Sequence, residues 1–169
     1  MINLKLTSPA VYEGGIVMVR KFYLWGVFVF FIFFSSCATL LNQTKTRNFK
    51  SLHCAVVPFV NYSETPLAGS RVAAILYGVL RSKGYAVDLL GGNETESDLK
   101  KKGYVCLVTG YVNEWRYKVG IDGEPAVSIT YVVKDLTTGK KIASGSLSAT
   151  EWGNKSLGLL TQQLFNKAF

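Results

Sequence analysis

The sequence predicts an α/β (α+β) fold, in which a single mixed β-sheet of about five strands is flanked by helices. Apolar and polar residues alternate from Pro125 to Leu136, and turn signals on both sides of this stretch are typical of an antiparallel meander. Two apolar runs in the first half of the chain are separated by a segment of helical periodicity, which favours parallel strands joined by a helix. Apolar residues at helical spacing near the C-terminus indicate a last helix that packs on the sheet.

The first strand and the first helix are expected between residues 52 and 83. The Val-rich run from Leu52 to Val60 predicts a buried strand, and Pro58 predicts a bulge or a strand end within it. After a turn-rich loop, a helix is expected from Pro66 to Lys83, with Gly84 just beyond its C-terminal end. The inward face of this helix is expected to carry Leu67, Val72, Ile75, Leu76, Val79 and Leu80.

The remaining elements follow in a regular order. They are expected as a strand at 85–89, a short polar helix at 95–102, three meander strands at 104–117, 125–136 and 141–150, and an amphipathic helix at 154–169. An Asp-Gly pair at 122–123 and the segment TTGK at 137–140 predict the two hairpin turns of the meander.

Residues 1–36 predict a leader that is removed from the mature protein. Two basic residues, Arg20 and Lys21, precede an uninterrupted apolar run from Phe22 to Phe34. As a helix this run would be about 20 Å long, shorter than the roughly 30 Å hydrocarbon core of a bilayer. The pattern therefore indicates a secretory signal and not a membrane anchor. We expect translation to begin at Met18, because residues 1–17 would place a non-basic extension before the basic pair.

Cys37 directly follows two serines, which resembles the lipobox of bacterial lipoproteins. In that family the cysteine is acylated and becomes the first mature residue, although Phe34 and Ser36 depart from the usual lipobox residues. The resemblance implies that Cys37 is lipidated, and Ala38 after it implies sorting to the outer membrane. Residues 37–51 are polar and predict a short tether, at most roughly 55 Å long when extended. A single periplasmic domain is then expected at 52–169.

The sequence offers little catalytic chemistry. His53 is the only histidine, and neither a serine-nucleophile motif, a zinc-protease motif nor a Gly-rich phosphate loop is present. Cys54 and Cys106 lack the spacing of a metal site, and either a disulfide or two buried thiols are compatible with their positions. We therefore expect no enzyme activity, no catalytic residue, no metal and no cofactor.

The formal net charge of +8 is compatible with anionic lipid headgroups or with a surface of scattered lysines. Nucleic acid is not an expected partner, because an exported lipoprotein rarely meets any.

The segment NEWRYKVGIDGEPAV, from Asn113 to Val127, carries more large and charged side chains than a hairpin turn needs. It is one part of three longer stretches, VVPFVNYSETPLAGSRVAAILYGVLRSKGY, VTGYVNEWRYKVGIDGEPAVSITYVVKDLTTGKKIASGS and EWGNKSL. Together they cover most of residues 54–165 and resemble the PelC family, the outer-membrane lipoproteins of the Pel exopolysaccharide secretion system.

The resemblance implies a fold similar to the N-terminal domain of TolB. It also implies a homo-oligomer, a dodecameric ring on the periplasmic face of the outer membrane below the β-barrel of PelB. Such a ring would funnel a cationic, partly deacetylated exopolysaccharide toward that barrel through an electronegative opening. Anchoring would be through the acyl chains on Cys37.

The resemblance implies lipidation for Cys37, contact with the polysaccharide at the pore for Asp122, and contact with the membrane for Trp152. From their positions beside these residues and in the shared motif, we further expect Glu124 to act with Asp122 at the pore, Lys155 to lie with Trp152 at the membrane, and Arg116 and Trp115 to form a subunit interface. Each role has a structural alternative, since any tight turn favours Asp-Gly, a tryptophan can pack a helix on the core, and a strand arginine is often only solvated.

A second function class remains open. A monomeric outer-membrane lipoprotein of similar shape could activate a periplasmic partner such as a peptidoglycan synthase. Such a protein would reach across the periplasm on a long disordered linker. The short tether predicted at 37–51 keeps the domain near the membrane and favours the ring.

Overall fold

The structure is a computed structural model, and it describes residues 38–45, 48–117, 124–151 and 155–169. The expected leader, Cys37, Asp122 and Trp152 lie outside these residues.

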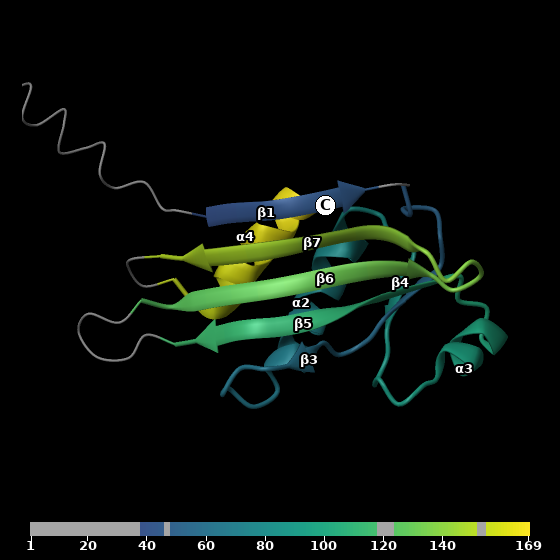
Figure 1. Cartoon of the computed structure of the whole chain (residues 1–169), viewed down its shortest axis with the longest axis horizontal. Coiled ribbons are helices and arrows are strands. Elements are labelled where there is room, and N and C mark those ends of the chain that lie inside the picture. Colours follow the sequence, from purple (N-terminus) through teal and green to yellow (C-terminus); the bar gives the residue numbers. More distant parts are fainter. Residues whose placement is uncertain (1–37, 46–47, 118–123, 152–154) are drawn as a thin grey trace, which may run out of the picture. The chain divides into compact units, whose positions relative to one another are not determined.

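The described residues form a seven-stranded mixed sheet in the order β1-β7-β6-β5-β2-β4, with β3 paired to β5 off this path (Figure 1). The strands are β1 (Ala38–Lys45), β2 (Cys54–Val56), β3 (Val60–Asn61), β4 (Val87–Leu89), β5 (Cys106–Arg116), β6 (Ala126–Asp135) and β7 (Lys141–Thr150). Strands β1, β7, β6 and β5 pair antiparallel, whereas β2 pairs parallel with both β4 and β5. The expected single mixed sheet is confirmed, with β1 and β3 as additions to the predicted strands.

Strand β1 corrects the tether expected at 37–51. It runs along β7 from the pair Ala38↔Ala149 to the pair Lys45↔Ala143, with a register shift between Leu41 and Gln43. This shift interrupts the alternation by which a strand is recognised in a sequence, and an edge strand needs only one partner. Within the rest of the predicted tether, Phe49 is buried and packs against Tyr85, with ring centroids 4.9 Å apart.

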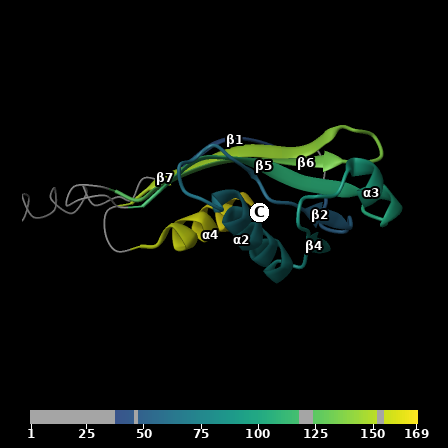
Figure 2. The same cartoon turned by 90° about the horizontal axis from the view of Figure 1, so that it is seen from below.

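Helices α2 (Ala68–Ser82) and α4 (Leu157–Ala168) pack side by side on one face of the sheet (Figure 2). The predicted end of the first helix is confirmed, because Gly84 has φ +80° and donates to the carbonyl of Arg81, while Tyr85 donates to the carbonyl of Leu80. The inward position predicted for Leu67 is wrong. This residue lies just before the helix at φ 61° and is 69% exposed, so it does not face inward.

Helix α3 (Glu96–Lys101) lies at the other end of the sheet, and Leu99 packs in a second, smaller apolar cluster with Ala55, Leu107 and Leu136. Ala55 on β2 and Leu107 on β5 alternate with the residues that face α2 and α4, so α3 covers the opposite face of the sheet. A capping box formed by Thr95 and Asp98 begins the helix, and the hydrogen bond from Thr95 lowers the pKa of the Asp98 carboxyl.

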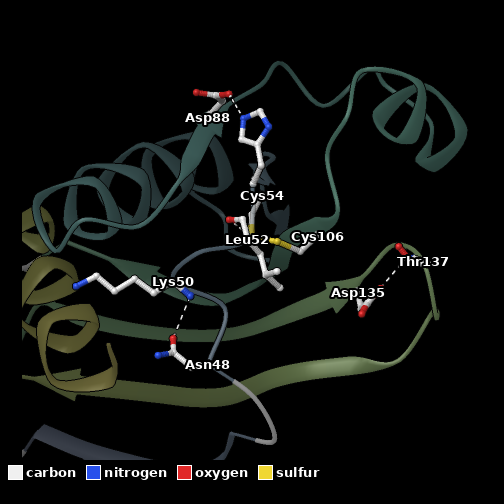
Figure 3. Close-up of a disulfide and its surroundings, with 9 residues drawn as sticks. Asn48, Lys50, Leu52, Cys54, Asp88, Cys106, Asp135 and Thr137 are labelled. Carbon is white, nitrogen blue, oxygen red and sulfur yellow. Dashed lines mark hydrogen bonds and ion pairs between the residues drawn. A yellow bond between two sulfur atoms is a disulfide. The ribbon is translucent and has the colours of Figure 1, made fainter.

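Cys54 and Cys106 form a disulfide, which answers the question that the sequence left open (Figure 3). The two cysteines are directly paired residues of the parallel strands β2 and β5, with Cα atoms 4.5 Å apart. Both are fully buried in the main core, between the sheet and helices α2 and α4. The bridge ties the parallel part of the sheet to the first strand of the meander.

Candidate functional site

The described sequence-predicted functional residues lie at or next to one end of the sheet, which we call the hairpin end. Its last paired residues are Ala38, Ala149–Thr150, Ala126–Val127 and Trp115–Arg116, on β1, β7, β6 and β5 in that order. Neighbouring strands lie about 4.8 Å apart, so Ala38 and Trp115 are separated by roughly 15 Å across three strand spacings. Ala38 directly follows Cys37 in the chain, and the other described residues at this end come next in the sequence to the segments 118–123 and 152–154, which contain Asp122 and Trp152.

Trp115 lies in the core, which corrects its expected position at a subunit interface. It is 3% exposed and belongs to the main apolar cluster, and its indole Nε1 has no hydrogen-bond acceptor among the described residues. A bulge between Val112 and Glu114 explains this position. The extra residue, Asn113, reverses the alternation, so that Trp115 and not Glu114 faces the helices.

The other described candidates lie on the surface of the hairpin end. Arg116 is exposed, and its Nε donates to the Glu114 carboxylate at 3.0 Å. Glu124 is half-buried and follows directly on the segment 118–123. Lys155 forms an ion pair with Glu151, and both side chains flank the segment that contains Trp152. Lys155 therefore already has an anionic partner within the protein.

An open groove of about 420 Å³ lies beside these residues, between the loop at 62–65 and the end of β5 at 113–117. Strand β3 creates it, because the pairing of Val60 with Tyr111 and of Asn61 with Val112 guides the loop along β5. The sequence analysis did not identify this groove. In the sequence, the loop at 62–65 is recognisable only as part of a turn-rich connection. The two walls of the groove are about fifty residues apart in the chain.

The loop wall of the groove is held by hydrogen bonds. The Asn61 side chain accepts from the backbone N–H of Ser63 at 3.0 Å and donates to the Thr65 carbonyl at 2.8 Å. The Thr65 hydroxyl donates to the Trp115 carbonyl at 2.7 Å, which joins the loop to β5. The loop is therefore pre-organised for a ligand, and binding needs little ordering of the backbone.

The sheet face opposite α2 and α4 continues the groove with polar side chains. Hydroxyl pairs link β6 to β7, Thr130 with Ser146 at 2.9 Å and Ser148 with Ser128 at 3.0 Å. The Asn113 amide donates to the Thr130 hydroxyl at 3.2 Å. This face presents hydroxyl and amide groups, which suit a hydrated polar ligand better than a lipid tail.

The described residues contain no group of three or more His, Cys, Asp or Glu side chains that could hold a metal ion. Within the same residues, no helix is long and apolar enough to cross a membrane. The described residues that line the groove include tyrosines, carboxylates, an arginine and an amide.

Comparison with protein-family models and with curated proteins gives no match. Among solved structures, the chain is similar to the PelC dodecamer from Paraburkholderia phytofirmans, with 30% identity, a TM-score of 0.71, and coverage of 78% of this chain and 94% of that chain. A single-substitution variant of the same dodecamer gives the same identity and TM-score, with 95% of that chain covered.

A lipoprotein from Neisseria meningitidis is more distant, at 22% identity and a TM-score of 0.48 over 68% of this chain and 95% of that chain. The first two matches extend over nearly the whole solved chain at 30% identity, and the chain therefore belongs to the PelC family.

Proposed function

We propose that the chain is an outer-membrane lipoprotein subunit of a ring on the periplasmic face, a dodecamer like PelC from Paraburkholderia phytofirmans. The ring funnels a cationic exopolysaccharide to the outer-membrane export barrel PelB, for secretion into a biofilm matrix. The observation that carries this proposal is the similarity to PelC over 94% of that chain.

The position of β1 supports close attachment to the membrane. If Cys37 carries the acyl chains, the next residue, Ala38, is already paired with Ala149 in the sheet. Little free chain then separates the lipids from the domain, and the hairpin end lies close to the bilayer surface. An activator that works across the periplasm needs a long linker, so this arrangement disfavours the second function class.

The residues of the hairpin end take separate roles in this proposal. Asp122 and Glu124 contact the polymer, Trp152 and Lys155 lie toward the membrane, and Arg116 contacts the neighbouring subunit. One exposed carboxylate binds an ammonium group with only about 0–1 kcal/mol. Copies of the same carboxylate around a ring give a summed field and multivalent contact, while each single contact stays weak enough to release the polymer.

Export of the polymer tests the proposal. In a strain that depends on this chain, Asp122→Asn is expected to reduce secreted polymer strongly. The matched control Glu96→Gln removes an exposed carboxylate on α3, at the other end of the sheet, and is expected to leave export unchanged. Normal export by Asp122→Asn would contradict the pore role, and a cell-wall defect with normal export would indicate the activator class instead.

A further inference from the structure

The groove at the hairpin end presents tyrosine rings to solvent. Tyr62 lines the groove and is 67% exposed, and its ring stacks on the ring of Tyr111 beside the groove, at 11° with centroids 5.8 Å apart. Tyr117 lines the same groove and is half exposed, and its hydroxyl accepts a hydrogen bond from Arg71 of α2 at 2.7 Å. A tyrosine ring combines a broad apolar face with a polar edge. A sugar ring matches it, because its C–H faces are apolar and its rim carries hydroxyls.

The charged groups of the groove favour a cationic ligand. Glu64 lines it, is exposed, and has no ion-pair partner among the described residues. Glu114 and Arg116 are paired with each other, so the described residues of the lining carry one unmatched negative charge, in a chain whose net charge is +8. An ammonium group gains both from a carboxylate and from the face of an aromatic ring. A neutral sugar gains only the ring contact.

We propose that this groove is a subsite for the exported polymer, and that it binds a short stretch of amino sugars with at least one free amine. Tyr62, held by its stacking on Tyr111, packs against a sugar face, and Glu64 pairs with the ammonium group. The ligand class rests on the proposed function, whereas the subsite is separate from the hairpin residue Asp122. Each protomer thereby contributes a second contact to the polymer, on the described residues of the hairpin end.

A second copy of the chain is a poorer occupant of the loop side of this groove, where Tyr62 and Glu64 lie, whereas Arg116 on the β5 side is the residue proposed to contact the neighbouring subunit. Stable protein–protein interfaces bury about 800 Å² on each partner around a largely apolar centre. The groove is open, with a volume of about 420 Å³, and its lining includes the exposed Glu64 carboxylate, which has no ion-pair partner among the described residues. Burying that carboxylate against another protein would cost free energy unless the partner supplied a cation.

Binding of defined oligosaccharides to the intact lipoprotein in detergent tests the proposal. Calorimetric titration at low salt would compare a β-1,4-linked glucosamine hexamer with the fully N-acetylated hexamer. The unsubstituted protein is expected to bind the amine form more tightly. Tyr62→Leu is expected to weaken binding of both hexamers about tenfold.

The remaining variants separate the ring contact from the charge contact. Glu64→Gln is expected to weaken only the amine form, about threefold. Tyr62→Phe keeps the ring, and Glu96→Gln removes a carboxylate on α3, so both are expected to bind like the unsubstituted protein.

Several results would overturn the subsite. They are no binding of either hexamer, equal affinity for the two hexamers, or unchanged binding by Tyr62→Leu. A change in native mass caused by Tyr62→Leu would also overturn it, because the groove would then be a contact between copies. The proposed function and the subsite can be refuted independently of each other. A chain that neither assembles nor supports export refutes the proposed function, whereas intact export and assembly without groove binding refute only the subsite.

Discussion

The two ends of the sheet are built in different ways. At the disulfide end, which we define as β2, β4 and α3, parallel strands are covered by helices on both faces and are crosslinked to β5 through Cys54–Cys106. At the hairpin end, the described helices cover the antiparallel strands on one face only, and among the described residues the other face carries hydroxyls, tyrosines and the groove. Parallel strands are usually buried on both faces, whereas antiparallel sheets tolerate one solvated face.

This difference separates stability from contact with partners. The disulfide end concentrates covalent and apolar interactions, so substitutions there are expected to change the free energy of unfolding. Substitutions at exposed positions of the hairpin end are expected to change binding and assembly, with little effect on unfolding.

Removal of the disulfide is expected to have the largest effect on stability. The bridge closes a loop with a sequence separation of 52 residues. Restricting the unfolded chain by a loop of this size contributes about 4 kcal/mol to the free energy of unfolding. The urea midpoint of unfolding should therefore be much lower for the Cys54→Ala/Cys106→Ala variant. Adding a reductant to the unsubstituted protein should lower its urea midpoint in the same way. A loss below about 1 kcal/mol would contradict the assignment of stability to this end.

The next largest difference in stability is expected between alanine variants at two glycines of α2. A Cβ atom at Gly69 would lie 1.9 Å from the carbonyl oxygen of Phe59, whereas one at Gly78 would meet nothing within 4 Å. Gly69→Ala is expected to destabilise the protein by about 1–3 kcal/mol, because the helix must move away from the strand connection. Gly78→Ala is the matched control and should stabilise by roughly 0.5–1 kcal/mol through helix propensity. Equal urea midpoints for the two variants would refute the close contact at Phe59.

The pH dependence at the disulfide end is expected to involve Asp88. Its carboxylate accepts hydrogen bonds from His53 at 2.8 Å and from Tyr104 at 3.2 Å, and the His53 bond is the main cause that lowers the pKa of Asp88. A lowered folded-state pKa adds stability above the unfolded value of about 3.9, which is lost as pH falls through the folded value.

His53→Ala should raise the pKa of Asp88 toward its ordinary value, measured by NMR titration of the carboxyl carbon. Tyr104→Phe should give a smaller rise, since the Tyr104 bond is a lesser cause of the shift. An unchanged Asp88 pKa in His53→Ala would refute the pairing.

The smallest effect is expected at Leu67, which joins the groove loop to α2. Its φ of 61° is unfavourable for a residue with a branched side chain, and the side chain is 69% exposed. Leu67→Gly relieves strain of about 1–2 kcal/mol, of which roughly 0.4–1 kcal/mol is offset by the greater entropy of the unfolded chain. A modest rise in the urea midpoint is expected, and a fall would mean that the Leu67 side chain makes a stabilising contact.

The sequence was sufficient to predict most of the fold, because its elements have strong local patterns. The meander strands and the last helix agree with alternation and helical spacing within a few residues. Strand β1 escaped prediction because a register shift after Leu41 breaks its pattern. The burial of Trp115 escaped for a similar reason, since only the bulge at Asn113 turns it inward.

The candidate site could be predicted from the sequence less completely than the fold. Local patterns identify turn residues, but the groove joins Tyr62 and Glu64 to the end of β5 through tertiary pairing of β3. The roles of Asp122 and Trp152 came from resemblance to the PelC family and remain predictions, because both residues lie outside the described part of the chain.

The native mass of the lipidated protein, extracted from membranes in mild detergent, tests the central proposal most directly. We expect a discrete assembly near twelve protomers that persists on dilution, as in the dodecamer from Paraburkholderia phytofirmans. A monomer at every concentration, with the acyl chains and detergent present, would contradict the ring and favour the activator class.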